Sequence, residues 1–253
     1  MEGLAVTDGI GQEFMRLTRH ASFTSDQQQG VPPPPVALTN DQGKSHIDLS
    51  RPEAIDLPSH CFRDLAEQRT SLRQYSAEPL TIEELSFLLW CTQGVKQIVG
   101  NQATFRTVPS AGARHAFETV LLVNRVVGLE PGLYHYLALD HKLVCLDTRT
   151  TMAAEVTQCC FGQSFVQGSA ATFIWIAVPY RMTWRYGQRG YRYLHLDAGH
   201  VCQNLYLAAE DIDAGACGVA AFDDDALNRL LGLDGESQFV IYVAPVGKKP
   251  GRR

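Results

Sequence analysis

The sequence predicts an α+β fold in which a core sheet carries long helices on its faces. Three observations predict it. Short β-rich runs at 117–123, 132–137 and 142–146 are separated by turn residues, which is typical of an antiparallel meander. The run 171–178 is almost continuously apolar and of strand length, which predicts a strand buried on both faces. Residues 191–213 carry one continuous apolar stripe at helical spacing, which predicts a long helix.

Length, charge and cysteine content limit the kinds of protein that this chain can be. The chain has 253 residues, 45% of them hydrophobic and 19% charged, which is enough to bury the core of one domain, with or without an extension. A net charge of −5 argues against a nucleic-acid or anionic-membrane partner, because either needs a basic field. Seven scattered cysteines without a C-x-x-C pair indicate a reducing cytoplasm, and we find neither a signal peptide nor an apolar run long enough for a membrane helix. We therefore expect a cytoplasmic protein that binds neither nucleic acid nor membrane.

Residues 1–55 are expected to form an extension, and residues 56–253 the domain itself. Four consecutive prolines at 32–35 favour polyproline II and exclude a helix there, while a short helix is expected at 11–20. The extension serves either as a tether or as a cover over an active site, and the residues alone leave both functions open.

Past residue 56, the first helix of the domain is marked at both ends. Thr81 and Glu84 form a capping box before an apolar stripe, and Gly94 is placed to end the helix. A polar stretch with glycine follows to Thr107. The small residues at 109–113 (PSAGA) then allow the backbone to come close to a flat ligand or another chain.

The long helix presents two stripes. The apolar stripe comprises Leu194, Ala198, Val201, Leu205 and Ala208, and the polar stripe beside it comprises Asp197, His200 and Asn204. Because a small core can cover only one side of such a helix, we expect a partner subunit to cover neighbouring residues such as Cys202 and Tyr206. Residues 151–161 should form another helix, 214–220 and 239–246 strands, and 223–231 a short helix capped by an aspartate.

The run from Arg69 to Tyr75 (RTSLRQY) is the strongest candidate for ligand binding. In an extended backbone, Arg69, Ser71 and Arg73 point to the same side. Arg69 and Ser71 would then offer a guanidinium fork and a hydroxyl to a phosphate, while Arg73 reaches a second part of the same elongated ligand. This pattern suggests a phosphorylated cofactor, although an R-x-S-x-R run also occurs on solvated edges and loops.

Other chemistries are unsupported by spacing. His195 and His200 are five residues apart, so they cannot share a metal on one helix face, and Cys159-Cys160 has no ligand nearby at metal-binding spacing. The acids at 223–225 fit a helix cap better than a metal site, and His200 and Asn204 can be satisfied core polar residues. No dinucleotide-binding glycine motif, nucleophile elbow or P-loop occurs. We therefore expect no metal.

Seven blocks of sequence, in order, resemble those of one family. They are RTSLRQY (69–75), LSFLLW (85–90) with Gln93-Gly94, PSAGA (109–113), GLYHY (132–136), YGQRGYRY (186–193), GHVCQNLYL (199–207) and AFDD (221–224). Together they look like the FMN-dependent nitroreductase family, and more narrowly its SagB-type, azoline oxidase-like dehydrogenase branch. The resemblance runs from about residue 56 to residue 247.

The resemblance implies a nitroreductase-like FMN-binding fold, with a central, mostly antiparallel sheet flanked by long helices. It also implies a domain-entwined homodimer with FMN sites at the subunit interface. At the FMN phosphate the resemblance implies Arg69 and Ser71, with Lys248 and Arg252 adding to the site. It implies Arg73 at the ribityl chain and pyrimidine edge, Gln163 at the pyrimidine side, and the backbone of Ala220 and Ala221 beside N5. The partner subunit would contribute Ser110, Ala111 and Gly112, which pack on the ring. The family often has glycine at the position of Ala221.

The implied activity is two-electron hydride transfer through flavin N5. The reaction is either NAD(P)H-dependent reduction of nitro- or quinone-like acceptors, or SagB-type dehydrogenation of a small heterocycle or peptide-derived substrate. Arg185-Tyr186 resembles a catalytic Lys-Tyr pair of the azoline-oxidase branch; an arginine, with a pKa above about 12, cannot serve as a general base, but the Tyr186 hydroxyl can relay a proton. The alternative from another class is a flavin-binding protein without turnover, for storage or regulation.

Overall fold

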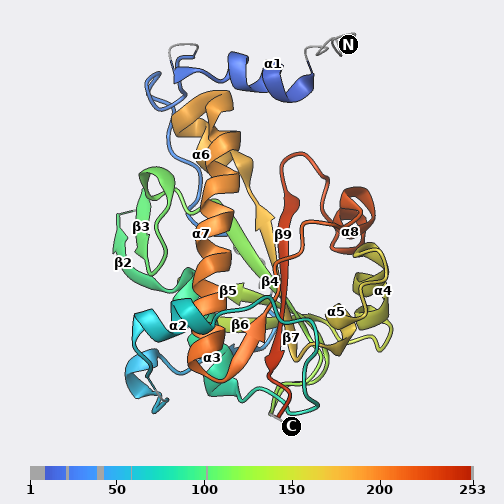
Figure 1. The fold of residues 1–253 in the computed structure, drawn as a ribbon. Coiled ribbons are helices and arrows are strands. Elements are labelled where there is room, and N and C mark those ends of the chain that lie inside the picture. The colour runs from blue at the N-terminus through green and yellow to red at the C-terminus, as the bar shows by residue number, and fades with distance from the viewer. Residues whose placement is uncertain (1–8, 21–22, 39–42, 58, 101, 252–253) are drawn as a thin grey trace.

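The computed structural model describes residues 9–20, 23–38, 43–57, 59–100 and 102–251, which form an α+β fold built on a large sheet (Figure 1). Within these residues the sheet has seven strands in the order β1-β6-β5-β4-β7-β9-β8, and every neighbouring pair is antiparallel. The strands are β1 (His46–Asp48), β4 (Phe117–Val123), β5 (Gly132–Leu137), β6 (Lys142–Asp147), β7 (Ala171–Ala177), β8 (Ala214–Ala216) and β9 (Phe239–Lys248). The expected antiparallel core sheet and its meander are confirmed.

Helices cover both faces of the sheet. They are α1 (Ile10–Leu17), α2 (Phe62–Gln68), α3 (Ile82–Gln93), α4 (Met152–Cys159), α5 (Phe165–Gly168), α6 (Pro179–Tyr186), α7 (Gly190–Asp211) and α8 (Asp224–Leu230). The longest, α7, crosses the front of the sheet in Figure 1, with α3 beside its C-terminal end and α6 beside its N-terminal end. Helices α4, α5 and α8 pack on the opposite face.

Two hydrophobic cores result, one on each face of the sheet. The alternation of side chains along β7 shows the division, because Phe173 and Trp175 enter the core under α3 and α7, whereas Ile174 and Ile176 enter the core under α4, α5 and α8. All seven residues of β7 are buried. The prediction of a strand buried on both faces is therefore confirmed.

Local signals fixed the ends of α3 and α8. The Thr81 hydroxyl accepts a hydrogen bond from Glu84 N (3.1 Å), and the Glu84 carboxylate accepts one from Thr81 N (2.9 Å), which is the predicted capping box. Gly94 is the C-cap of α3. The Asp223 side chain accepts a hydrogen bond from Ala226 N (2.9 Å) and caps α8, as predicted.

Two segments differ from the prediction. The polar stretch before Thr107 forms a hairpin of β2 (Val95–Val99) and β3 (Ala103–Arg106). The sequence did not predict these strands, because the stretch is polar and contains glycine. The strand expected at 214–220 ends at Ala216. Beyond Ala216 the chain still bonds β9 through Cys217 N to Pro245 O (3.0 Å) and Val219 N to Val243 O (2.7 Å), while Gly218 N between them donates to a side-chain hydroxyl on α7.

The N-terminal extension is fastened to the body. Strand β1 pairs with β6 at the edge of the sheet. Further upstream, Trp184 Nε1 donates to Val31 O and Arg181 Nε donates to Pro35 O, both at 2.8 Å, from side chains that are themselves buried. Residues 31–35 therefore lie against α6, Leu38 N donates to Glu118 of β4 (2.9 Å), and β1 makes the end of the predicted extension part of the core sheet.

The stripe on α7 needs no partner to cover it. All five of its residues are at most 5% exposed within the single chain, and Cys202 is 3% exposed. The expectation that a partner subunit covers Cys202 is therefore wrong, because Tyr242 of β9 and the loop at Cys217 and Gly218 of the same chain lie beside its side chain. The exposed face of α7 carries Leu196, Gly199, His200 and Gln203 instead.

Across the described residues, no helix combines the length and the hydropathy needed to cross a membrane.

Candidate functional site

The segment after α2 is held in an extended form beside strand β8. Leu72 N donates to Ala216 O (2.9 Å), and Ser71 forms a parallel bridge with Ala216. Arg73 and Ser71 are exposed and Arg69 is half-buried. The extended backbone that the sequence predicts for this run is therefore present at Ser71.

Tyr206 of α7 connects this segment to the loop after β8. Its hydroxyl lies 3.1 Å from Ser71 Oγ and accepts a hydrogen bond from Gly218 N (2.7 Å). The guanidinium carbon of Arg69 lies 5.3 Å from the centre of the Tyr206 ring, within the range of a cation–π contact. We call Arg69, Ser71, Arg73, Tyr206 and Gly218 the anion cluster.

The charge of the anion cluster is uncompensated. Among the described residues, no carboxylate forms an ion pair with Arg69 or Arg73. The charge of Arg73 reaches the neighbouring Cys217 thiol, whose pKa is raised by burial but lowered in part by this guanidinium and by a hydrogen bond with Tyr206. Two cations and two hydroxyls without a local acid form a site for an anion.

The predicted ring-side residues continue from this cluster. Ala220 and Ala221 are both exposed and follow Gly218 after one buried residue, Val219. Gln163 Nε2 donates to Ala221 O (3.0 Å) and to Cys160 O (2.9 Å). The chain therefore brings Gln163 to the exposed alanines.

A second group of predicted residues gathers elsewhere, around the small-residue loop. Ala111 N donates to both carboxylate oxygens of Asp197 at 3.3 Å, and the Ser110 hydroxyl also bonds Asp197. Gly112 adopts φ +58, and a Cβ built on it would stand 2.5 Å from Tyr186 Oη and 2.9 Å from Arg185 Cδ. We call Ser110, Ala111, Gly112, Arg185, Tyr186 and Asp197 the loop cluster.

Burial shapes the electrostatics of the loop cluster. Asp197 is 4% exposed, and burial raises the pKa of its carboxyl, although the bonds from Ser110 and Ala111 N and the charge of His200, at 4.0 Å, oppose that rise. Burial, reinforced by the nearby Arg185 charge, lowers the pKa of Arg114, which donates to Gly112 O (3.1 Å). These bonds fix the loop from both sides.

Arg185 and Tyr186 face the loop together. The Arg185 guanidinium carbon lies 5.6 Å from the centre of the Tyr186 ring. The Tyr186 ring packs edge-on against Tyr193, with centroids 4.8 Å apart. Tyr186 is thus held by two ring contacts, and its hydroxyl lies against Gly112.

The two clusters lie on opposite flanks of α7. Asp197 and Tyr206 are nine residues apart, which is about 13 Å along a helix. Nine residues make about two and a half turns, so the two side chains point to opposite sides of the helix. The sequence predicted contacts with one ligand for residues of both clusters. In a single chain, those residues face away from each other.

The remaining predicted contacts fall outside both clusters. Lys248 Nζ pairs with the carboxylate of Glu84 and donates to Ile212 O (2.8 Å), so its charge is already compensated. The structure therefore gives Lys248 a role in holding β9 to α3, and its addition to the phosphate site stays a prediction. Arg252 lies outside the described residues.

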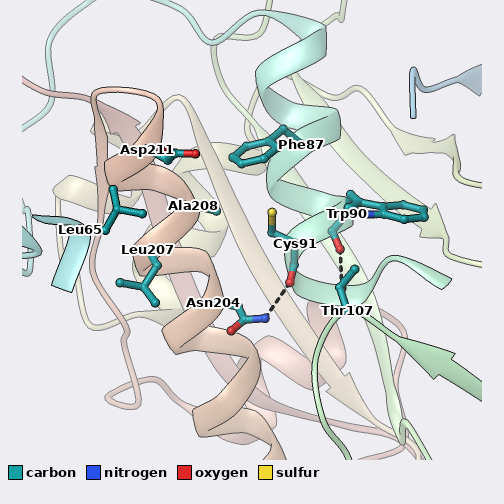
Figure 2. Close-up of a pocket in the computed structure, with 9 residues that line it drawn as sticks. All are labelled: Leu65, Phe87, Trp90, Cys91, Thr107, Asn204, Leu207, Ala208 and Asp211. Atoms are coloured by element: carbon teal, nitrogen blue, oxygen red, sulfur yellow. Dashed lines mark hydrogen bonds between the residues drawn. The ribbon is translucent and has the colours of Figure 1, made fainter. Parts of the chain in front are cut away.

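A groove of about 440 Å³ lies between α3 and α7, on the same flank of α7 as Asp197 (Figure 2). Its few polar groups are occupied, since Asn204 Nδ2 donates to Cys91 O (2.9 Å) and Asp211 pairs with His60 (3.1 Å). The groove is lined by Leu65, Phe87, Trp90, Cys91, Thr107, Asn204, Leu207, Ala208 and Asp211. Burial and the nearby Asp211 raise the pKa of the Cys91 thiol to about 12, so this thiol in the wall of the groove is uncharged at neutral pH. This groove suits apolar side chains better than a phosphate.

Sequence reasoning missed three functional candidates. Tyr206 was expected at a subunit interface, Gly218 within a strand, and Asp197 only as part of a polar stripe. Their roles depend on contacts between segments far apart in the chain, such as Ser71 with Tyr206. Among the described residues, no group of three or more His, Cys, Asp or Glu side chains could hold a metal.

Comparison with known proteins gives a consistent family. The model of the nitroreductase family matches residues 66–248. A protein of Methanocaldococcus jannaschii that is provisionally named a nitroreductase is 36% identical over 196 residues, covering 77% of this chain and 94% of the relative. The trifolitoxin-processing protein TfxB of Rhizobium leguminosarum bv. trifolii is 29% identical over 133 residues, covering 51% of this chain and 36% of the relative.

The fold agrees with this family. The crystal structure of a provisionally named nitroreductase from Anabaena variabilis superposes with a TM-score of 0.68 and 29% sequence identity. The match covers 84% of this chain but only 43% of that longer chain. The nitroreductase-like fold that the sequence suggested is confirmed.

Proposed function

Because this chain belongs to the nitroreductase family, we propose that it is an FMN-dependent oxidoreductase with the FMN phosphate at the anion cluster. The observation that carries the proposal is the donor set: two guanidiniums that no carboxylate of the described residues pairs with, beside the hydroxyls of Ser71 and Tyr206. A phosphate dianion fits this set, because fork-shaped guanidiniums and hydroxyls match its oxygens.

The other residues of this surface would orient the cofactor. Arg69 and Ser71 hold the phosphate, and Arg73 carries positive charge towards the ribityl chain and the pyrimidine edge. Gln163 and the exposed backbone of Ala220 and Ala221 border the ring. When bound, FMN supplies two-electron redox chemistry at N5, which the side chains of this site lack.

We further propose a homodimer in which the loop cluster of one copy completes the FMN site of the other. Two observations support this. The two clusters lie on opposite flanks of α7, so one ligand cannot reach both in the same chain. The exposed face of α7 carries Leu196 at 60% exposure beside Gly199, which has open space around it, so a second helix can approach closely. The groove of Figure 2 adjoins this face and offers apolar surface to the partner.

Light scattering tests the shared site. A dimer that holds FMN at micromolar concentration is expected. A monomer that retains FMN under the same conditions contradicts the sharing of sites.

For the reaction, we favour SagB-type dehydrogenation of a small heterocycle or peptide-derived substrate over NAD(P)H-dependent reduction of nitro- or quinone-like acceptors. The name of the relative TfxB, a trifolitoxin-processing protein, supports a peptide-derived substrate. In this chain Tyr186 would hold or relay the proton at the substrate, while Arg185 supplies fixed positive charge beside it. Gly112 leaves the space that the Tyr186 hydroxyl needs.

Flavin reduction by candidate donors tests the enzyme. The purified protein should be yellow, and a substrate or NAD(P)H should bleach it anaerobically, with the colour returning once an acceptor is added. Bleaching by an azoline-containing peptide, without NAD(P)H, supports dehydrogenation. A flavin that stays oxidised with every donor indicates a binding protein without turnover and contradicts the proposal.

A further inference from the structure

We infer that Tyr206 is a positioning residue, whose hydroxyl directs the Ser71 proton towards the cofactor phosphate. The inference rests on the proposed FMN site and goes beyond it, because Tyr206 itself need not touch the ligand. It depends on the direction of a short chain of hydrogen bonds that runs from Gly218 through Tyr206 to Ser71.

The direction begins at the backbone. An N–H group can only donate, so the Tyr206 oxygen must accept at its 2.7 Å contact with Gly218 N. The Tyr206 proton is then free to bond a neighbour. Ser71 Oγ, at 3.1 Å, is the acceptor within reach. Once Ser71 accepts from Tyr206, its own proton is available to another acceptor, such as a phosphate oxygen.

The competing neighbour is the Cys217 thiol. Burial raises the pKa of this thiol, so it stays neutral, and a neutral sulfur is a weak acceptor. Ser71 is therefore the better acceptor for the Tyr206 proton. Bonds aligned in one direction polarise each other, so the Ser71 hydroxyl becomes a stronger donor to an anion.

The Tyr206 ring has a second effect on the same site. The Arg69 guanidinium lies over it at 5.3 Å, which limits the positions of a long cationic side chain before any ligand arrives. The Tyr206 ring and hydroxyl thus organise two neighbouring phosphate donors, Arg69 and Ser71. Fixing donors in advance reduces the entropy lost on binding.

Gly218 allows the chain to pass close enough for this contact. A Cβ at this position would stand 2.4 Å from Tyr242 Oη and 3.2 Å from Cys202 Sγ. A larger residue would force either Tyr242 or the backbone at this position to shift. Glycine at 218 therefore leaves the backbone N–H free to reach the Tyr206 hydroxyl.

The test compares FMN with riboflavin, which lacks the phosphate. Apoprotein of the wild type and of Tyr206→Phe is titrated with each flavin. The variant keeps the ring and its contact with Arg69 but loses the hydroxyl, so its affinity for FMN should fall roughly tenfold. Its affinity for riboflavin should stay within twofold of wild type. Tyr242→Phe, which removes a hydroxyl beside the same glycine without touching Ser71, should leave both affinities unchanged.

A double-mutant cycle sharpens the result. Because Tyr206 acts through Ser71, adding Tyr206→Phe to Ser71→Ala should cause little further loss of FMN affinity. Equal losses for FMN and riboflavin, or full additivity with Ser71→Ala, overturn the inference. If wild type itself binds riboflavin as tightly as FMN, the phosphate site fails, and with no flavin binding at all the proposed function fails with it.

Discussion

The anion cluster and the loop cluster are built on opposite principles. In the anion cluster, two guanidiniums and two hydroxyls are left without an acid, and Ser71 and Arg73 are exposed. In the loop cluster, the polar groups satisfy one another: Asp197 is buried, accepts from Ala111 N and the Ser110 hydroxyl, and fixes the backbone around Gly112. The first cluster attracts a charge, and the second presents a rigid surface.

Because of this difference, substitutions in the two clusters should affect FMN binding and turnover separately. Loss of a donor in the anion cluster should weaken the cofactor, because its charge has no other source. Changes in the loop cluster should alter turnover or stability while FMN stays bound. Substitutions in each cluster test that separation.

Tyr186→Phe should lower turnover by about 10²-fold or more, as for the loss of a general acid–base group, while FMN content stays intact. Steady-state kinetics with the bound flavin quantified by absorbance measures both. Tyr193→Phe, in the neighbouring ring, is the matched control, and Arg185→Lys should be tolerated. Turnover of Tyr186→Phe at the parental rate would transfer the proton role to His200 or to solvent.

Arg69→Ala should weaken FMN binding by about 1.5–3 kcal/mol, roughly ten- to over a hundredfold, because a charge-assisted bond to a partly buried phosphate is lost. Titration of the apoprotein measures the change. Arg63→Ala removes a guanidinium from exposed α2, where it pairs with Glu67, and should leave affinity unchanged. Unchanged affinity in Arg69→Ala would remove the central assignment.

Gly112→Ala should destabilise the loop cluster by about 1–2 kcal/mol, because alanine is strained at φ +58 and its Cβ meets Tyr186 Oη. Urea unfolding of the apoprotein measures this loss. Gly168→Ala, at a helical glycine with open space around it, serves as the control and should not destabilise. Equal stabilities of the two variants would show that the loop moves freely and is not fixed as described.

Asp197 should make the free energy of unfolding depend on pH. Because burial raises its folded-state pKa, the folded protein binds this proton more readily than the unfolded chain does. The ionised carboxylate thus costs stability at neutral pH, and the cost is relieved as the pH falls through the raised pKa towards the ordinary value of 3.8.

Asp197→Asn lacks this titration. Urea unfolding at pH 7 and pH 5 should therefore show the wild type gaining stability relative to Asp197→Asn as the pH falls. A His200→Gln background removes the imidazole 4.0 Å from Asp197, so the pH effect that remains belongs to the carboxylate. A gap that is constant with pH in that background would mean that the Asp197 pKa is not raised.

Much of the fold was predictable because its signals are local. The capping box at Thr81, the apolar run of β7 and the stripe of α7 each lie within one element. The site was predictable only in part. The run from Arg69 to Arg73 stands out as a pattern, but its connection to Tyr206 and Gly218 depends on three segments that meet in space. The sequence likewise did not reveal that Lys248 pairs with Glu84, because the two residues are far apart in the chain.

Other predictions stay untested by the structure. The cytoplasmic location, the identity of the electron donor and the dimer all remain predictions. The dimer matters most, because the proposed site needs a surface from each copy.

Mixed dimers test whether each FMN site takes its anion cluster from one chain and its loop cluster from the other. Arg69→Ala damages the anion cluster and Tyr186→Phe the loop cluster, so each variant alone should be poorly active with limiting FMN. If each site takes one cluster from each chain, a mixed dimer has one site with both defects and one site with none. An equal mixture, unfolded and refolded together, should then recover roughly a quarter of wild-type turnover. Turnover that stays at the average of the two separate variants would mean that each site lies within one chain, and would contradict the proposed site shared between two chains.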